Sequence, residues 1–194
     1  MFDRFGRLGL CTILVLAQWL TGCAALRPAQ DLPASNASID RFLLHGRVAV
    51  KLDERGYAAG LRWRHSPTGD SVTLLSPLGS VVAEIESDGE GAKLTTSDNK
   101  IHRANDVQSL TREVLGWDLP LSGLRYWVTG RADPALPVQS QDRDDAQRPT
   151  SLTQSEWTVT YLSYFGASAM PARMLLVHDR LKLRLIVDRW ELPK

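Results

Sequence analysis

The feature that most constrains this fold is an alternation of apolar with other residues that recurs in short segments along the chain. It is clear in GRVAVKL, residues 46–52, and in LKLRLIVDRW, residues 181–190. Successive side chains of a strand point to opposite faces, so each such segment predicts a strand with one buried face. About nine of these segments occur, mostly in hairpin succession with turn residues such as Gly56 between them. They predict an antiparallel sheet, in a sandwich or a barrel.

One segment in the middle of the chain breaks the alternation. Asn105 is the expected N-cap of a helix that stops at Gly116, and Ser122 begins a second, shorter helix. Their apolar sides are formed by Val107, Leu110, Val114 and Leu115, and by Leu124, Trp127 and Val128. Such helices must bury these sides, most simply against the concave face of a strongly curved sheet. The predicted fold is mainly β with a helical plug, followed by a polar loop over residues 131–151.

The N-terminus reads as a bacterial lipoprotein signal peptide. Arg4 and Arg7 precede the mostly apolar residues 8–20, which are too few to span a bilayer, and LTGC follows, ending at Cys23. This pattern predicts cleavage before Cys23 and lipidation of its thiol; the alternative is an ordinary secretory peptide with an incidental cysteine. We therefore expect a removed signal over residues 1–22, a lipidated flexible tether over 23–38, and a single domain over 39–194.

Cleavage changes the charge and the cysteine content of the chain. The full sequence has 23 basic and 22 acidic residues, and loss of Asp3, Arg4 and Arg7 leaves 21 of each. A neutral chain has no global field to attract nucleic acid. Cys11 is lost with the signal, so no disulfide forms within the mature chain.

The sequence offers little for catalysis. The four histidines lie singly, no cysteine remains in the domain to bind a metal, and no nucleophile elbow or phosphate loop is present. Glycoside hydrolysis needs two carboxylates that meet in a cleft, and nothing in the sequence singles out such a pair. We expect no catalytic residues, no metal and no cofactor, and a chain that is not an enzyme.

An apolar residue occupies an unusual place in the stretch LLSPLGS. Pro77 and Gly79 predict a chain reversal, which puts Leu78 at its tip, where polar residues are usual. Leu78 is either a plain surface residue or a group presented to an acyl layer.

Several motifs, taken in order, resemble the LolB family of outer-membrane lipoprotein receptors. They are the lipobox ending at Cys23, GRVAV, LRWRH, LLSPLGS, LPLSGLRYWVTG, WTVTYLSY, MPARMLL and LKLRLIVDRWEL. The chain departs from the family in the charged segment around residues 142–148 and in a short segment before the barrel. The resemblance implies an open, incomplete antiparallel β-barrel whose inserted helices form a lid over an apolar cavity.

The resemblance also implies a function. A receptor of this family accepts lipoproteins from a LolA-like periplasmic carrier and inserts them into the inner leaflet of the outer membrane without ATP. The family's protruding leucine matches Leu78, within an insertion loop formed by Pro77, Leu78 and Gly79. Ala24, rather than aspartate, after Cys23 favours the outer membrane over inner-membrane retention. We expect a monomer that faces the periplasm.

The inward faces of the strands, with Trp127 from the lid, then supply candidates for the cavity wall, each of which is alternatively a plain core residue. They are Val48, Val50, Leu61, Trp63, Leu74, Trp127, Leu183 and Leu185. The competing function is that of a structural or assembly lipoprotein, which binds a protein partner and no acyl chains.

Overall fold

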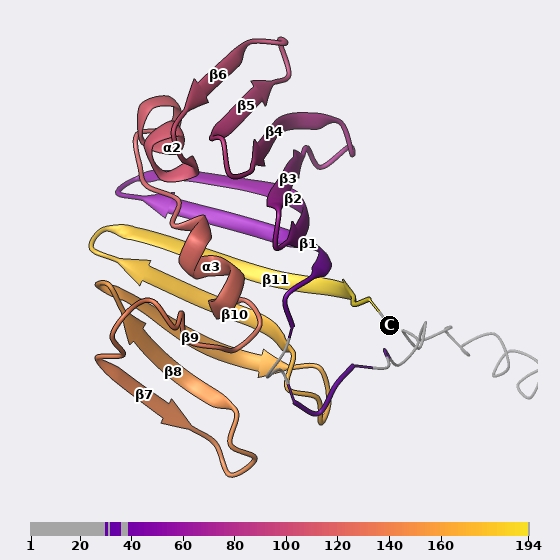
Figure 1. Ribbon diagram of the computed structural model, residues 1–194, viewed down its shortest axis with the longest axis vertical. Coiled ribbons are helices and arrows are strands. Elements are labelled where there is room, and N and C mark those ends of the chain that lie inside the picture. The colour runs from indigo at the N-terminus through magenta and orange to yellow at the C-terminus, as the bar shows by residue number, and fades with distance from the viewer. Residues whose placement is uncertain (1–29, 31, 36–38, 194) are drawn as a thin grey trace, which may run out of the picture.

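A single antiparallel sheet dominates the computed structural model, which describes residues 30, 32–35 and 39–193. Within these residues the sheet has 11 strands in the order β6-β5-β4-β3-β2-β1-β11-β10-β9-β8-β7 (Figure 1). The strands are β1 Phe42–Leu52, β2 Arg55–Ser66, β3 Gly69–Leu75, β4 Val81–Ser87, β5 Ala92–Thr96, β6 Ile101–Ala104, β7 Ser140–Arg143, β8 Pro149–Gln154, β9 Trp157–Tyr164, β10 Pro171–His178 and β11 Leu181–Glu191. The helices are α2 Val107–Leu115 and α3 Leu121–Trp127.

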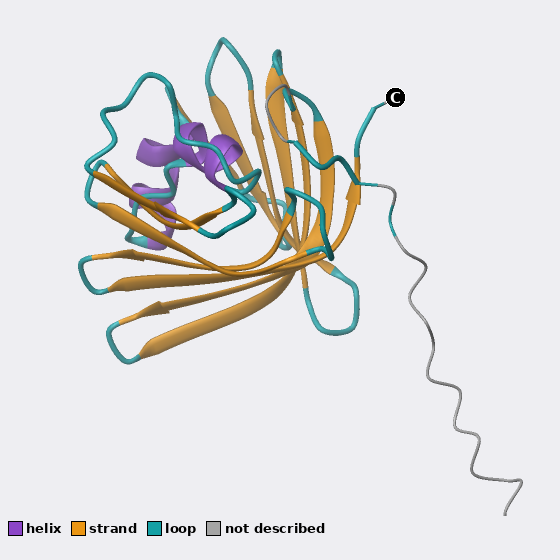
Figure 2. Cartoon of the chain, turned by 90° about the horizontal axis from the view of Figure 1, so that it is seen from below, coloured by secondary structure: helices purple, strands orange, loops and turns teal. Residues whose placement is uncertain are grey.

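The first and last strands join the two halves of the sheet. Every other pair of neighbouring strands is consecutive in the chain, but β1 pairs with β11. The end strands β6 and β7 do not pair with each other, so the barrel is open. Figure 2 shows the sheet curling around the two helices. The predicted fold class, a mainly β open barrel with inserted helices, is confirmed.

The two helices lie where the broken alternation placed them, with small differences at their starts. The N-cap of α2 is Asp106, not the predicted Asn105, because the Asp106 carboxylate accepts the backbone N–H of Ser109 at 2.7 Å. The predicted stop is correct: Gly116 has φ 79°, a left-handed conformation that glycine adopts without strain. Helix α3 begins at Leu121, after Pro120, rather than at Ser122.

The predicted polar loop over residues 131–151 is wrong in part. Its second half forms β7 and the beginning of β8, a hairpin at one edge of the sheet. No residue of SQDR is buried, and the three buried residues of PTSLTQ are Pro149, Leu152 and Gln154, so apolar alternation gives a weak signal there. This hairpin accounts for the two strands beyond the nine expected.

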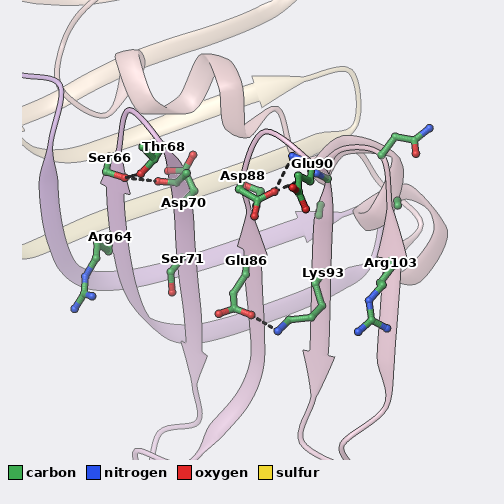
Figure 3. Close-up of a pocket in the computed structure, with 16 residues that line it drawn as sticks. Arg64, Ser66, Thr68, Asp70, Ser71, Glu86, Asp88, Glu90, Lys93 and Arg103 are labelled. Atoms are coloured by element: carbon green, nitrogen blue, oxygen red, sulfur yellow. Dashed lines mark hydrogen bonds and ion pairs between the residues drawn. The ribbon is translucent and has the colours of Figure 1, made fainter.

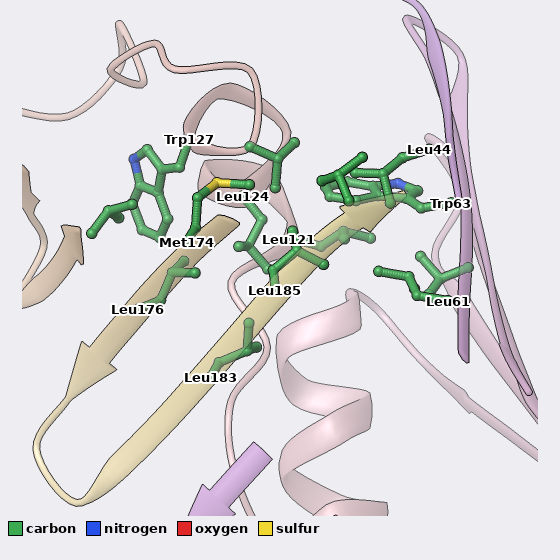
Figure 4. Close-up of a cluster of buried hydrophobic side chains, with 14 of the residues drawn as sticks. Leu44, Leu61, Trp63, Leu121, Leu124, Trp127, Met174, Leu176, Leu183 and Leu185 are labelled. Carbon is green, nitrogen blue, oxygen red and sulfur yellow. The ribbon is translucent and has the colours of Figure 1, made fainter. Parts of the chain in front are cut away.

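The inward face of the sheet and the helices enclose the apolar core. Register places inward residues opposite one another across the strands, for example Val50 opposite Leu183 and Val72 opposite Ile85. Figure 4 shows the core side chains of the sheet gathered against those of α3. Among the described residues, no helix is both long enough and apolar enough to span a bilayer.

Candidate functional site: an apolar hollow and an exposed leucine

An apolar hollow lies between the concave face of the sheet and the helices. No polar atom contributes to its exposed lining, and its free volume is about 90 Å³. Seven of the eight predicted wall residues line it: Val48, Val50, Leu61, Trp63, Leu74, Leu183 and Leu185. The strand register explains this gathering, because Val48 lies opposite Leu185 and Leu61 lies opposite Leu74. Val72 and Ile85 extend the same wall across β3 and β4.

The roof of the hollow comes from the helices and from the segment that joins them. Its residues are Leu115, Trp117, Leu119, Leu121, Leu124 and Val128. None of these six was among the predicted wall residues. A signal was nevertheless present: the joining segment LGWDLPL has an apolar residue at every second position from 115 to 121.

Trp127 does not line the apolar hollow. Its indole N–H donates to Gln154 Oε1 at 2.9 Å, and its carbonyl accepts the Tyr161 hydroxyl at 3.0 Å. The Gln154 amide also accepts the backbone N–H of Asp133 at 2.8 Å and donates to the carbonyls of Asp133 and Leu136. These bonds hold the end of α3 against β8 and β9. Trp127 thus fills the other side of the interior.

The size of the hollow determines what it holds as it stands. An engineered apolar cavity of about 150 Å³ accommodates benzene, whereas this hollow offers about 90 Å³. A long acyl chain therefore fits only when the roof moves away from the sheet.

The segment that joins the helices is tied mainly to α2. The Arg112 guanidinium donates twice to the Asp118 carboxylate, with both N···O distances at 2.6 Å. These bonds, with a smaller effect from Gln108, hold the pKa of Asp118 below its usual value. The backbone N–H of Leu119 donates to Thr111 Oγ1 at 2.9 Å. Helix α2 and the joining segment are thereby coupled.

The turn between β3 and β4 presents Leu78 to solvent. The backbone N–H of Gly79 donates to the Ser76 carbonyl at 2.9 Å, and that of Ser76 donates to the Ser80 carbonyl at 2.8 Å. Gly79 has φ 85°, a conformation that side chains rarely adopt. This tight turn leaves Leu78 94% exposed. Val81 and Val82, at the start of β4, are also exposed.

The predicted lipidation site, Cys23, lies outside the described residues. The described part of the preceding segment joins the domain at the end of β11, where the backbone N–H of Trp190 donates to Gln30 Oε1 at 3.1 Å. The backbone N–H of Ala169 donates to the Pro33 carbonyl at 3.0 Å.

Other surface features of the described chain show no catalytic arrangement. No group of three or more metal-binding side chains occurs in the part of the chain that the structure describes. A polar hollow on β2 to β6 is lined by charged and hydroxyl side chains, with Glu86 paired to Lys93 (Figure 3). Its charged groups are arranged as on an ordinary solvated sheet face.

The fold and the hollow define an open β-barrel with a purely apolar interior site beneath helices. The family model "Outer membrane lipoprotein LolB" matches residues 40–190, and the chain belongs to this family. A protein of Nitrosomonas europaea named outer-membrane lipoprotein LolB is 37% identical, over 86% of this chain and 79% of its own length. A protein of the same name from Thiobacillus denitrificans is 37% identical, over 94% of this chain and 97% of its own length. Family membership confirms that the chain is not an enzyme.

Solved structures offer more distant likenesses. A LolA superfamily protein from Nitrosomonas europaea has a TM-score of 0.49 at 9% identity, covering 80% of this chain and 87% of its own. The structure titled putative outer membrane lipoprotein-sorting protein domain, from Vibrio parahaemolyticus, has a TM-score of 0.48 at 8% identity. It covers 81% of this chain and 87% of its own. Similarity at this level supports no functional conclusion.

Proposed function

We propose that this protein is an outer-membrane lipoprotein receptor, anchored through Cys23 and facing the periplasm. It accepts lipoproteins from a LolA-like carrier, holds their acyl chains in the apolar hollow and inserts them into the inner leaflet. The observation that carries the proposal is a hollow with no polar lining between sheet and helices. The names of its LolB relatives agree with it.

The energetics explain why such a receptor needs no chemical fuel. Burying one methylene is worth about 0.8 kcal/mol, so a lipidated cysteine with several long chains is strongly disfavoured in water. Its chains move from the carrier to this hollow and then to the bilayer if each site binds them more tightly than the last. The receptor therefore has to bind acyl chains more weakly than the membrane does.

In this proposal Leu78 makes the membrane contact. A leucine side chain gains about 1.5–3 kcal/mol when it passes from water into an apolar layer. The rigid turn keeps Leu78 projecting, with Val81 and Val82 exposed behind it. The turn, with Leu78, Val81 and Val82, enters the acyl layer of the membrane while the hollow releases its cargo.

The test of the function is a transfer experiment. A purified carrier loaded with a lipoprotein is mixed with the chain from residue 23 carrying Cys23→Ala. We expect the lipoprotein to move to the receptor. A stable complex with the carrier but without transfer would contradict the proposal and favour a structural lipoprotein that only docks.

A substitution at the turn separates acceptance from release. We expect Leu78→Glu to accept cargo from the carrier as the unsubstituted protein does, because it lies outside the hollow, but to lose most release into phosphatidylethanolamine–phosphatidylglycerol liposomes. Leu162→Glu is the matched control, since Leu162 is 53% exposed on β9. Normal release by Leu78→Glu, or an equal loss in the control, would exclude an insertion role for the turn.

A further inference from the structure

A second hollow lies directly beside the apolar one. It has a volume of about 690 Å³ and lies between the segment that joins α2 to α3 and the turns β8–β9 and β10–β11. Trp117 lines both hollows. Unlike its neighbour, the second hollow also exposes polar atoms. A ligand with apolar and polar parts can therefore occupy both at once.

The indole groups of the domain divide into two sets. Trp63, Trp127 and Trp190 each donate their indole N–H, to Asp70, Gln154 and the Pro171 carbonyl respectively. The indole N–H groups of Trp117 and Trp157 have no acceptor within the described chain, and both residues line the second hollow. Buried indoles normally find a hydrogen-bond partner. The two that lack one thus share a single site.

Trp157 makes the clearest case for a missing ligand. Its side chain is 95% buried, since only 5% of the residue is exposed. Its ring stacks on His178 at 5.1 Å between centroids and lies 6.1 Å from the ring of Trp127. The ring is thus fixed by its neighbours. Within the described chain its unpaired N–H is not among the fully enclosed polar atoms, so the N–H is accessible to a ligand on a residue that lines the second hollow.

Other groups around the second hollow are also donors. The exposed residues Ser122 and Ser155 line its rim, and neither hydroxyl makes a hydrogen bond within the described chain. The charged groups that line it are paired with one another or with a neighbour: Arg112 with Asp118, Arg180 with Asp53 and Asp179, and Glu156 with His178 at 3.5 Å. The free polar groups therefore suit a neutral ligand that carries hydrogen-bond acceptors.

We propose that the second hollow binds the head of the cargo's lipidated cysteine while its acyl chains lie in the apolar hollow. This inference rests on the proposed function. The head is a glyceride joined to sulfur, with two ester carbonyls and an acylated amine, so it consists mainly of acceptors. Such carbonyls are costly to bury without donors, and the apolar hollow offers none. The Trp157 and Trp117 N–H groups donate to them, and Trp117 lies at the junction of head and chains.

The test compares two ligands on one protein, the chain from residue 23 with Cys23→Ala. One ligand is a dipalmitoyl-glyceryl-cysteinyl peptide, and the other is the same peptide with a plain S-hexadecyl group and no glyceride. Binding is measured below the critical micelle concentrations. We expect Trp157→Phe and Trp117→Phe each to weaken binding of the glyceride peptide about threefold to tenfold, the usual effect of losing one hydrogen bond. Binding of the S-hexadecyl peptide is expected to stay unchanged in Trp157→Phe, because Trp157 does not line the apolar hollow.

A second readout does not depend on the variants folding. In the chain with Cys23→Ala, we expect the Trp157 and Trp117 indole N–H signals in ¹H–¹⁵N spectra to shift further with the glyceride peptide than with the S-hexadecyl peptide. Leu162→Ala, an exposed residue on the outward face of β9 that lines neither hollow, is the control and is expected to bind both ligands normally.

Equal weakening of the binding of both ligands in Trp157→Phe, or indole signals that do not distinguish the ligands, would overturn the head site and leave the receptor function standing. If the chain with Cys23→Ala bound neither ligand, both the head site and the receptor function would be overturned.

Discussion

The interior has two sides that are built from the same alternating strands and yet differ in packing. Beside β8, β9 and β10, the side chains of Leu152, Val159, Met174 and Leu176 are almost completely enclosed, and Trp127 is hydrogen-bonded among them. Beside β1 to β4, the inward side chains border a hollow that the helices do not fill. We call these the filled side and the hollow side. The comparison shows that one sheet can provide a rigid anchor for the helices and an unfilled site next to it.

The difference arises from how the roof is attached on each side. Helix α3 is bonded to the filled side through Trp127 and Tyr161. The joining segment above the hollow side is instead bonded to α2, through Asp118 and Thr111. If the hollow opens, we expect α2 and the joining segment to move together while these bonds keep α3 in place.

The largest expected effect comes from the polar bonds of the filled side. Gln154→Leu leaves the Trp127 and Asp133 N–H groups buried without an acceptor. At about 1–3 kcal/mol for each such group, we expect a loss of about 4 kcal/mol in the free energy of unfolding. Urea denaturation measures this loss. A loss below about 1 kcal/mol would mean that these bonds do not anchor α3.

Truncation of leucines compares the two sides directly. Leu176→Ala removes a fully enclosed side chain, and we expect a loss of about 3 kcal/mol in unfolding free energy. Leu74→Ala, beside the hollow, is expected to cost about 1 kcal/mol because this half-buried side chain has fewer packing partners to lose. Equal losses in urea denaturation would remove the distinction between the sides.

Enlarging a valine tests the room on each side. Val72→Phe projects into the hollow, so we expect a change in unfolding free energy below about 1 kcal/mol together with loss of lipopeptide binding. Val159→Phe, in a site without space, is expected to cost about 1–3 kcal/mol or more. Normal lipopeptide binding by Val72→Phe would contradict a role for the hollow.

The smallest effect concerns alkaline pH. Burial raises the pKa of the Tyr161 phenol above its usual value of 10.0. Because the folded state favours the neutral phenol, the contribution of this group to the free energy of unfolding is complete below pH 10. That contribution declines as the pH rises above 10. We expect Tyr161→Phe to weaken the dependence of unfolding free energy on pH above 10, measured by urea denaturation at several pH values. An unchanged dependence would contradict burial of this hydroxyl.

The sequence predicted the faces of the strands well, but it did not distinguish the two sides. Alternation placed Val48, Leu61 and Leu183 on the inward face, and all three line the hollow. The helical period of Leu124, Trp127 and Val128 placed Trp127 in the same wall, because a period shows only which way a side chain points. Whether it meets a cavity or a neighbour depends on long-range partners, here Gln154, 27 residues further along the chain. The β7–β8 hairpin was missed because β7 buries no residue and two of the three buried residues of β8 are Pro149 and Gln154.

The turn was easier to predict because its geometry is local. Pro77 and Gly79 define a reversal from neighbouring residues alone, and the structure leaves Leu78 almost fully exposed at its tip. The roles of Leu78 and Cys23 are not local properties, and they stay predictions.

The central claim is that acyl chains enter the hollow side of the interior. It is tested most directly by NMR of the methyl-labelled chain with Cys23→Ala, bound to the dipalmitoyl lipopeptide. We predict intermolecular NOEs from the acyl methylenes to the methyl groups of Leu61, Val72 and Leu185, and none to those of Met174 and Leu176. NOEs confined to exposed methyl groups, with Leu61, Val72 and Leu185 unaffected, would contradict it.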